Sequence, residues 1–426
     1  MNLDRTKQPR ISPVELKRIP EAQKSQLKNG VPVYMINAGT EELMRIEFIF
    51  NAGQVVENFP LVASTTNTML TEGSENYSAK EINSAFDFYG AFINPYNQKD
   101  SSGVTVFLLN KHLDKILELC QELIFKPVFP EDELNNLQKK RLQVYLMNRE
   151  KVQVLANDKF LESVFGATHP YGKPITSTDF ENVTRTMLQN FHSDYYSVSN
   201  MTIIIAGKIP GNTLSVLNRY FGTLNSPVKI HAINDIRISN NSDKRGFIEK
   251  KDAVQSAVRI GSATINKQHK DFNGLMILDT ILGGYFGSRL MKNIREEKGY
   301  TYGISSSLVS MKKSGYKIIA TEVGKKYTEK TIDEIYKEIR LLQTTFVEPE
   351  ELDVVRSYMA GEMVRMFDGP FALAESFRAV WDYGLDNNYY YELAEKIKTI
   401  SPDEIIELAK TYYNIDDLFE ITAGSK

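Results

Sequence analysis

The chain of 426 residues has little of several features that would mark particular classes of protein. It has one cysteine, Cys120, so no disulfide can form within it and a disulfide-stapled scaffold is excluded. No stretch approaches the ~18 apolar residues that a membrane-spanning helix needs. The 51 basic and 54 acidic residues give a formal net charge of -3 without a long block of either sign. We therefore expect no membrane span and no nucleic-acid partner.

Side chains that could bind a metal or act as a nucleophile are also few. Cys120 occupies an apolar-periodic position of KILELCQELIF, which predicts a buried and unreactive thiol. His169 lies in the segment THPYGK, where we expect a turn histidine that satisfies backbone groups. The five histidines are far apart in sequence and form no pair with the spacing of metal ligands. They are His112, His169, His192, His231 and His269.

The first twenty residues, MNLDRTKQPRISPVELKRIP, contain no apolar segment of the kind found in export signals. As the sequence stands, we expect a cytoplasmic protein. If an export signal has been removed from it, the expected location is the periplasm.

The remaining composition, with 42% apolar and 25% charged residues, is that of an ordinary globular protein long enough for more than one core. Segments with alternating apolar residues predict strands; they include VPVYMI, MRIEFIF, GVTVFLL and MTIIIAG. Amphipathic segments between them, such as HLDKILELCQELIF and PEDELNNLQKKRLQVYLMNRE, predict helices. Because strands and helices are mixed throughout, the pattern favours an α+β fold.

The two halves of the chain resemble each other, which indicates an internal duplication. The segment FPEDELNNLQKKRL matches VEPEELDVVRSYM, and YGAFINPYNQKDSSGVTVFL matches KGYTYGISSSLVSMKKSGYKII. The matched residues lie 209 to 218 positions apart and are Leu134 and Leu352, Gly90 and Gly299, and Gly103 and Gly315.

The polar and weakly periodic segment 225–246 is predicted to be a linker. It divides the chain into a predicted N-terminal domain, residues 1–224, and a C-terminal domain, residues 247–426. Two similar domains that face each other would enclose a space at their interface, which is a usual place for a ligand site.

The segment LVASTTNTMLTEGS, residues 61–74, predicts a helix that ends before Gly73. Five small hydroxyl or amide side chains follow one another in it, from Ser64 to Thr68. Thr and Asn are poor helix formers, so packing around this helix must hold it. Helix propensity therefore does not explain the composition of this segment.

Several segments, in this order and spacing, make the chain resemble the pitrilysin/insulinase superfamily of zinc peptidases. The resemblance covers almost the whole chain and is strongest to the branch of the mitochondrial processing peptidase and the bacterial two-subunit enzymes. It implies two duplicated domains, each a mainly antiparallel sheet with helices packed on one face. The segments are LKNGVPVYMI, FNAGQVVENFP, MLTEGSENYSAKEI, THPYGKPITSTDFENVT, FHSDYYSVSNMTIIIAG and LGGYFGSRLMKNIREEKGYTYGISSS.

Active members of that superfamily carry the zinc motif His-x-x-Glu-His on the helix that precedes an ML-x-x-G ending. The two His bind Zn²⁺ and the Glu polarises the attacking water. Anchoring on Gly73 places the three positions on Ser64, Asn67 and Thr68. Hydroxyl and amide groups bind Zn²⁺ weakly and do not act as bases near neutral pH. We therefore expect no metal and no cofactor in this chain.

The third zinc ligand of the superfamily is a Glu about 75 residues further along, which would fall here near 143–148. From Gln143 to Asn148 no carboxylate is present, and Glu150 is the nearest one. The resemblance therefore implies that the whole metal site has been lost.

The second half retains two residues that match a functional pair of the superfamily. Arg295 and Tyr302, in REEKGYTY, correspond to an Arg and a Tyr that bind the substrate backbone and stabilise the developing oxyanion. A guanidinium and a phenol can both donate hydrogen bonds to negative charge that appears in the transition state. The alternative is a solvated helix residue for Arg295 and a half-buried strand residue for Tyr302.

Just upstream, the segment LGGYFGSRL contains Gly283, Gly284 and Gly287. It resembles, in a shorter form, the glycine-rich loop of the non-catalytic processing-peptidase subunit. Such a loop would contact substrate, because glycine lets the backbone approach a ligand closely. The alternative is a connector between two helices.

The resemblance implies a zinc-free, substrate-binding subunit of a heterodimeric peptidase, inactive alone. Its expected partner is a homologous subunit that bears the zinc, and the expected substrate is a peptide or an unfolded polypeptide. The alternative is a non-catalytic scaffold or peptide-binding protein of the same fold. A peptidase active on its own would need zinc at an unrecognised site.

Overall fold

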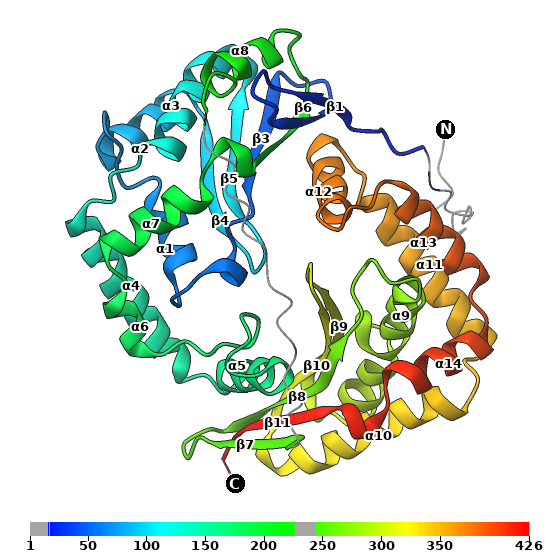
Figure 1. Cartoon of the computed structure of the whole chain (residues 1–426). Coiled ribbons are helices and arrows are strands. Elements are labelled where there is room, and N and C mark those ends of the chain that lie inside the picture. Colours follow the sequence, from blue (N-terminus) through cyan, green and yellow to red (C-terminus); the bar gives the residue numbers. More distant parts are fainter. Residues whose placement is uncertain (1–15, 17, 226–242, 426) are drawn as a thin grey trace, which may run out of the picture.

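The computed structural model describes residues 16, 18–225 and 243–425. Within these ranges the strands form a six-stranded sheet in the first half of the chain and a five-stranded sheet in the second (Figure 1). Most of the predicted linker 225–246, including His231, lies outside the described residues. None of the helices in the described ranges combines the length and apolar character required to cross a bilayer.

The first sheet has the strand order β1-β2-β6-β3-β5-β4. Its neighbours run antiparallel, except that β2 and β6 are parallel. The four predicted strand segments all lie in this sheet, so those predictions are confirmed. The strands are β1 (Gln23–Gln26), β2 (Pro32–Asn37), β3 (Leu43–Phe50), β4 (Phe92–Asn97), β5 (Ser102–Leu109) and β6 (Met201–Gly207).

The second sheet, β7-β11-β8-β10-β9, repeats the order and directions of the first sheet without β1. The prediction of two duplicated α+β units is therefore confirmed. The parallel ladder with β11 begins at Arg245, so β7 starts two residues before the predicted C-terminal domain. The strands are β7 (Arg245–Glu249), β8 (Gln255–Thr264), β9 (Thr301–Ser310), β10 (Gly315–Gly324) and β11 (Phe419–Gly424).

The helices of the two halves follow the same duplication. Leu134 and Leu352 are both buried, in α4 and α11, and Gly90 and Gly299 both adopt a positive φ just before β4 and β9. The helices of the first half are α1 (Val62–Met69), α2 (Ala79–Phe88), α3 (Leu113–Phe125), α4 (Glu131–Arg149), α5 (Val152–Phe165), α6 (Ser177–Asn182), α7 (Arg185–Tyr195) and α8 (Thr213–Tyr220). Those of the second are α9 (Phe272–Asp279), α10 (Thr328–Thr344), α11 (Pro349–Arg365), α12 (Pro370–Trp381), α13 (Asn388–Thr399) and α14 (Pro402–Tyr412), with π-helical segments at Thr280–Gly284 and Met291–Glu297.

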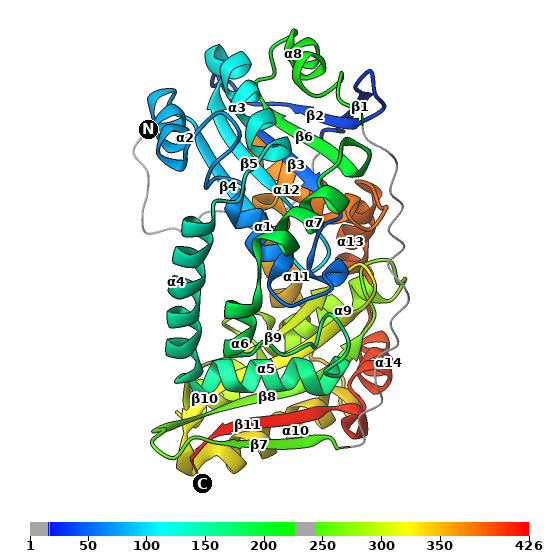
Figure 2. The ribbon, with the colours of Figure 1, turned by 60° about the vertical axis from the view of Figure 1, so that its left-hand side comes forward.

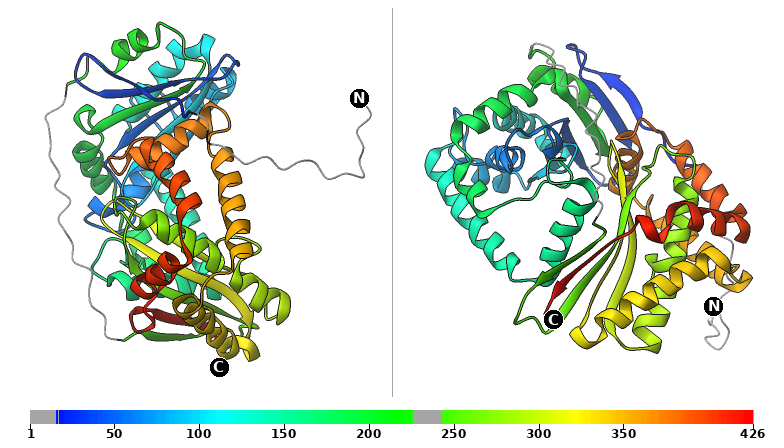
Figure 3. Two further views of the ribbon diagram at one scale, coloured as in Figure 1. Left: turned by 90° about the vertical axis from the view of Figure 1, so that its right-hand side faces the viewer. Right: turned by 60° about the horizontal axis from the view of Figure 1, so that its bottom comes forward.

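Each half covers part of the other half's sheet. Helix α12 of the second half packs on β2 and β6 of the first sheet, and α5 of the first half packs on β8 and β11 of the second (Figures 1 and 2). The right-hand view of Figure 3 shows the second sheet with the helices of its own half on one side and the first half on the other. This exchange of helices joins the two halves.

Strand β3 shows why both faces of the first sheet are needed. Every second residue, from Met44 to Phe50, belongs to the core under the helices of the first half. The alternate positions Arg45 and Glu47 face the second half, because a strand turns successive side chains to opposite faces. There Arg378 of α12 forms an ion pair with Glu47 and a hydrogen bond of 2.9 Å with Ser101. A buried charge cluster thus holds α12 on the sheet.

Candidate functional site

Helix α1 contains the positions that match the zinc motif. It is preceded by Leu61, which has a left-handed φ of 71°, and it packs against α7 and β4. Six of its eight residues are buried, so tertiary packing holds a segment of low helix propensity, as expected from the sequence. The buried residues are Val62, Ala63, Thr65, Thr66, Asn67 and Met69.

Ser64 and Thr68 lie one turn apart on the same face of α1. The Thr68 hydroxyl donates to the backbone oxygen of Ser64 at 2.9 Å. The guanidinium of Arg141, on α4, donates to the hydroxyl oxygens of Ser64 and Thr65, each at 2.9 Å. A cation that belongs to the chain itself therefore bonds to Ser64, one of the two positions that correspond to metal-binding histidines.

Asn67, in contrast, points into the core and is only 1% exposed. Its side-chain nitrogen donates to the backbone oxygen of Gly103 at 2.9 Å and to the hydroxyl of Tyr196 at 3.1 Å. The second half repeats this arrangement, because the hydroxyl of Tyr413 donates to Asp279, at the end of α9, at 2.8 Å. The structure thus separates Asn67 from the face that Ser64 and Thr68 share.

Glu57 lies at the entrance to α1, where its carboxylate accepts a hydrogen bond of 3.0 Å from the backbone nitrogen of Ala63. Burial raises the pKa of Glu57 to about 7, although Lys173 and Lys99 oppose the shift. Burial lowers the pKa of Arg141, and the charge of Glu57 partly offsets that effect. The face of α1 therefore carries one acid and one guanidinium that influence each other.

The region predicted to match the third zinc ligand lies on α4, which extends to Arg149. Glu150, the nearest carboxylate, follows the helix and forms an ion pair with Lys250 of the second half. It therefore acts between the halves rather than at α1. Gln143 is exposed, and no carboxylate from α4 bonds to Ser64 or Thr68 within the described residues.

The predicted pair of the second half is accessible. Tyr302, at the start of the edge strand β9, is 93% exposed. Arg295 lies in the π-helical segment Met291–Glu297, with its guanidinium 4.4 Å from the ring centre of Phe286. In the described part of the chain, neither side chain forms a hydrogen bond or an ion pair. Both groups are free to bind a ligand.

The three glycines of the neighbouring segment have different surroundings. A Cβ at Gly283 would lie 2.5 Å from the backbone nitrogen of Ser306, so this glycine allows close packing on β9. A Cβ at Gly287 would lie 2.8 Å from the ring of Tyr285, and one at Gly284 would lie 3.3 Å from the nearest backbone oxygen. Gly283 thus has a packing role, while the exposed Phe286 stands between the other two glycines.

A family model described as "Insulinase (Peptidase family M16)" matches residues 35–179. A second model, described as "Peptidase M16 inactive domain", matches residues 182–359. The chain belongs to the M16 peptidase family.

Among its relatives, an "uncharacterized zinc protease" of Rickettsia felis is 26% identical over 92% of this chain and 92% of its own length. The "non-peptidase homolog YmxG" of Helicobacter pylori is 22% identical over 84% of this chain and 83% of its own. A crystal structure of a peptidase M16 inactive domain from Pseudomonas fluorescens superposes with a TM-score of 0.83, at 22% identity, over 95% of this chain and 98% of that one. The M16 relatives thus include proteins named as peptidases and one named as a non-peptidase.

The residues at the M16 metal position do not fit zinc. Ser64 and Thr68 offer only hydroxyls there, the Arg141 guanidinium bonds to Ser64 and to the neighbouring Thr65, and a guanidinium repels a cation. Throughout the part of the chain that the structure describes, no group of three or more His, Cys, Asp or Glu side chains is placed to hold a metal ion. We derive no metal chemistry from this M16 chain.

The isolated histidine and cysteine take the structural roles predicted for them. The ring Nδ1 of His169 accepts a hydrogen bond of 3.0 Å from the backbone nitrogen of Tyr171, and its backbone oxygen accepts two more in the same turn. Cys120 is fully buried, and burial raises the pKa of its thiol. Both predictions are confirmed.

Three residues of the site could not be assigned from the M16 resemblance. Arg141 lies just before the window searched for the third ligand, and only its basic character hinted at a role. Glu57 is a lone acid in FNAGQVVENFP, and Phe286 is a lone aromatic residue among glycines. Each acquires its role from an element distant in sequence or from a backbone turn.

Proposed function

We propose that this M16 chain is the zinc-free, substrate-binding subunit of a two-chain peptidase. In this proposal a homologous partner supplies the zinc and the catalytic base, and the chain supplies Arg295 and Tyr302. The observation that carries the proposal is the contrast between the halves. The first half holds the Arg141 guanidinium against Ser64, one of the two positions of the metal-binding histidines. The second half keeps Tyr302 exposed and Arg295 partly exposed, and among the described residues neither side chain has a hydrogen bond or an ion pair.

The hydrogen-bond donors of Arg295 and Tyr302 suit the carbonyl groups of a peptide. A guanidinium carries several N–H donors, and a phenol adds one O–H donor. Directed at a peptide carbonyl, such donors strengthen as negative charge develops on the oxygen during attack by water. Phe286 packs over the guanidinium and restricts its orientation, which reduces the entropy lost on binding.

The proposed substrate is a peptide or an unfolded polypeptide, bound between this chain and the partner. The relatives named as peptidases support membership of a proteolytic system. Those named as inactive or as a non-peptidase support a subunit without activity of its own.

The test is to mix the purified chain with an M16 chain of the same organism that has an intact His-x-x-Glu-His motif, and to follow cleavage of a fluorogenic peptide. We expect hydrolysis only in the mixture. Arg295→Ala and Tyr302→Phe should each lower kcat/KM by about tenfold to a thousandfold. The matched controls Lys292→Ala and Tyr358→Phe, which change exposed residues nearby, should leave it unchanged.

Two results would overturn the proposal: failure of the two chains to associate, or full activity of the mixture with Arg295→Ala. A scaffold or peptide-binding protein is the second candidate, favoured by the relative named as a non-peptidase. It predicts peptide binding by the isolated chain and no gain of hydrolysis on mixing.

A further inference from the structure

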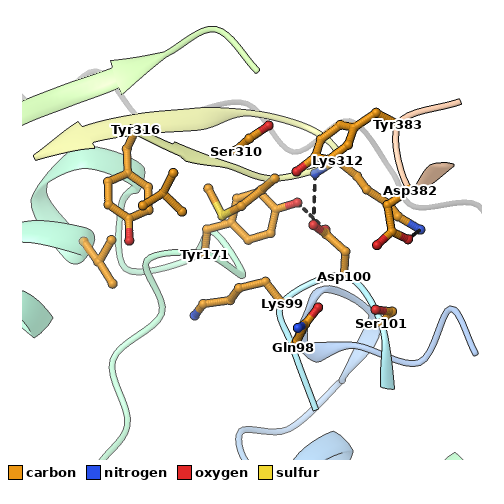
Figure 4. Close-up of a pocket in the computed structure, with 13 residues that line it drawn as sticks. Gln98, Lys99, Asp100, Ser101, Tyr171, Ser310, Lys312, Tyr316, Asp382 and Tyr383 are labelled. Atoms are coloured by element: carbon orange, nitrogen blue, oxygen red, sulfur yellow. Dashed lines mark hydrogen bonds and ion pairs between the residues drawn. The ribbon is translucent and has the colours of Figure 1, made fainter. Parts of the chain in front are cut away.

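A second candidate site lies between the two halves, away from Arg295 and Tyr302. It is a cavity of about 320 Å³. The turn between β4 and β5, residues 98–101, lines it from the first half, and the turn between β9 and β10, residues 311–314, contributes from the second (Figure 4). These turns are equivalent in the two repeats, so the cavity lies where the repeats meet. Its volume is at the lower end of the ~300–1,000 Å³ of small-ligand pockets.

Several polar groups of the cavity wall are occupied by one another. The carboxylate of Asp100 accepts from the hydroxyl of Tyr171 and, at 2.9 Å, from the backbone nitrogen of Lys312. The Lys312 ammonium lies 3.1 Å from the side-chain oxygen of Asn51 and 3.5 Å from Asp382. These groups hold the halves together, and the charge of each is already paired within the protein.

Lys99 is different. Its ammonium forms no hydrogen bond and no ion pair within 4 Å with any described residue. Burial lowers its pKa, while the charges of Glu57, Asp100 and Asp158, all beyond that distance, oppose the shift. An ammonium that is partly removed from water and not paired gains by meeting an anion.

Tyr316 supplies a second unused donor. Its ring packs against Phe160 and Phe165 of α5, which fixes its direction. Its hydroxyl has no hydrogen-bond partner in the part of the chain that the structure describes. Figure 4 shows the Lys99 side chain extending below Tyr171, so that its amine and the Tyr316 hydroxyl lie on the same side of that ring.

Apart from Gln98, Ser101 and Ser310, the rest of the wall is apolar. Leu161, Val309 and Met311 line the cavity together with the tyrosine rings. A ligand that fills it must therefore bring an apolar group as well as a negative charge, because apolar surface buried there is removed from water.

We propose that this cavity binds a carboxylate that carries an apolar group, with Lys99 and Tyr316 as the donors to the carboxylate. Two sources have this chemistry: the C-terminal residue of a peptide with an apolar side chain, and a free apolar amino acid derivative. Binding belongs to the isolated chain and does not require the zinc-bearing partner.

The test uses the full chain and calorimetric or NMR titration with matched probes. N-acetyl-leucine and N-acetyl-leucinamide differ only in the negative charge, as do a heptapeptide ending in leucine and its C-terminal amide. We expect at least one acid to bind about tenfold or more tightly than its amide. Preference for the peptide acid alone identifies a peptide terminus as the ligand, and preference for N-acetyl-leucine identifies the free molecule.

The variants assign the effect to residues. Lys99→Met should abolish the preference for the acid, Lys99→Arg should retain it, and Tyr316→Phe should weaken acid binding severalfold. Lys330→Met, on the exposed surface of α10, is the matched control and should bind as the parent does. The proposal is overturned if acids and amides bind equally, if none of the four probes binds at ~10 mM, or if folded Lys99→Met keeps the preference.

Discussion

Asp100 and Lys312 stand at equivalent positions of the two repeats, 212 residues apart, and contact each other across the junction of the halves. The carboxylate of Asp100 accepts a hydrogen bond of 2.9 Å from the backbone nitrogen of Lys312. Tyr171 and Tyr383, also 212 residues apart, stand on the same cavity wall. The duplication thus brings like positions together at the centre of the molecule.

This contact predicts a loss of stability when the carboxylate is removed. Asp100→Ala leaves the hydroxyl of Tyr171 and the backbone nitrogen of Lys312 without their acceptor. Each unsatisfied buried donor costs about 1–3 kcal/mol, and with two such donors the free energy of unfolding should fall by about 2–6 kcal/mol. Urea unfolding of the variant measures it, with the exposed Asp252→Ala as control. A midpoint equal to that of the control would show that the contact contributes nothing.

The guanidinium beside α1 predicts that chelators have no effect on the isolated chain. Because the Arg141 guanidinium bonds to Ser64 at the metal position, EDTA should leave the thermal midpoint unchanged, and elemental analysis should find well below one zinc per chain. Arg141→Ala should lower stability by about 1–2 kcal/mol, since Ser64 and Thr65 lose a charge-assisted bond. Stoichiometric zinc in the purified chain would contradict this account of α1.

Glu57 predicts a dependence of stability on pH. Its pKa is about 7 in the folded chain and near 4.3 in an unfolded one, so the folded state binds more protons between these values. Its contribution to stability is fully present below about pH 4 and is lost as the pH rises through 7. Glu57→Gln should therefore match the parent at pH 5 more closely than at pH 8.

At pH 8 the Glu57→Gln chain should be the more stable one, by about 1–2 kcal/mol. Thermal unfolding at the two pH values measures the difference, and Glu392→Gln, on the exposed surface of α13, should show no such trend. Equal effects of Glu57→Gln at both pH values would mean that the carboxyl titrates normally in the folded protein.

The exposure of Tyr302 predicts that it can be removed without harm to the fold. Because Tyr302 is 93% exposed, folding buries almost none of its surface, and Tyr302→Ala should change the free energy of unfolding by less than about 0.5 kcal/mol. Phe286→Ala, 63% exposed and stacked on Arg295, should cost at most about 1 kcal/mol. A thermal midpoint many degrees lower for Tyr302→Ala would favour a structural role over the proposed binding role.

Sequence alone determined the elements and their duplication. The alternating residues of β3 and the amphipathic pattern of α3 predict a strand and a helix, because the position of apolar residues fixes which side of an element can be buried. Gly103 and Gly315 are equivalent positions of the repeat, and both require glycine because a Cβ at either would lie 2.5 Å or less from a backbone oxygen. The absence of zinc ligands at Ser64 and Thr68 is likewise a property of the sequence.

Only the tertiary structure shows which elements cover the faces of these strands and helices. The pattern of β3 puts Arg45 and Glu47 on one face but does not say that α12 covers it and buries them with Arg378. It does not bring Arg141 to Ser64, or Lys99 and Tyr316 to one cavity. The physical reason is that periodicity is local, whereas a charge acquires its partner from an element that the fold brings in from elsewhere in the chain.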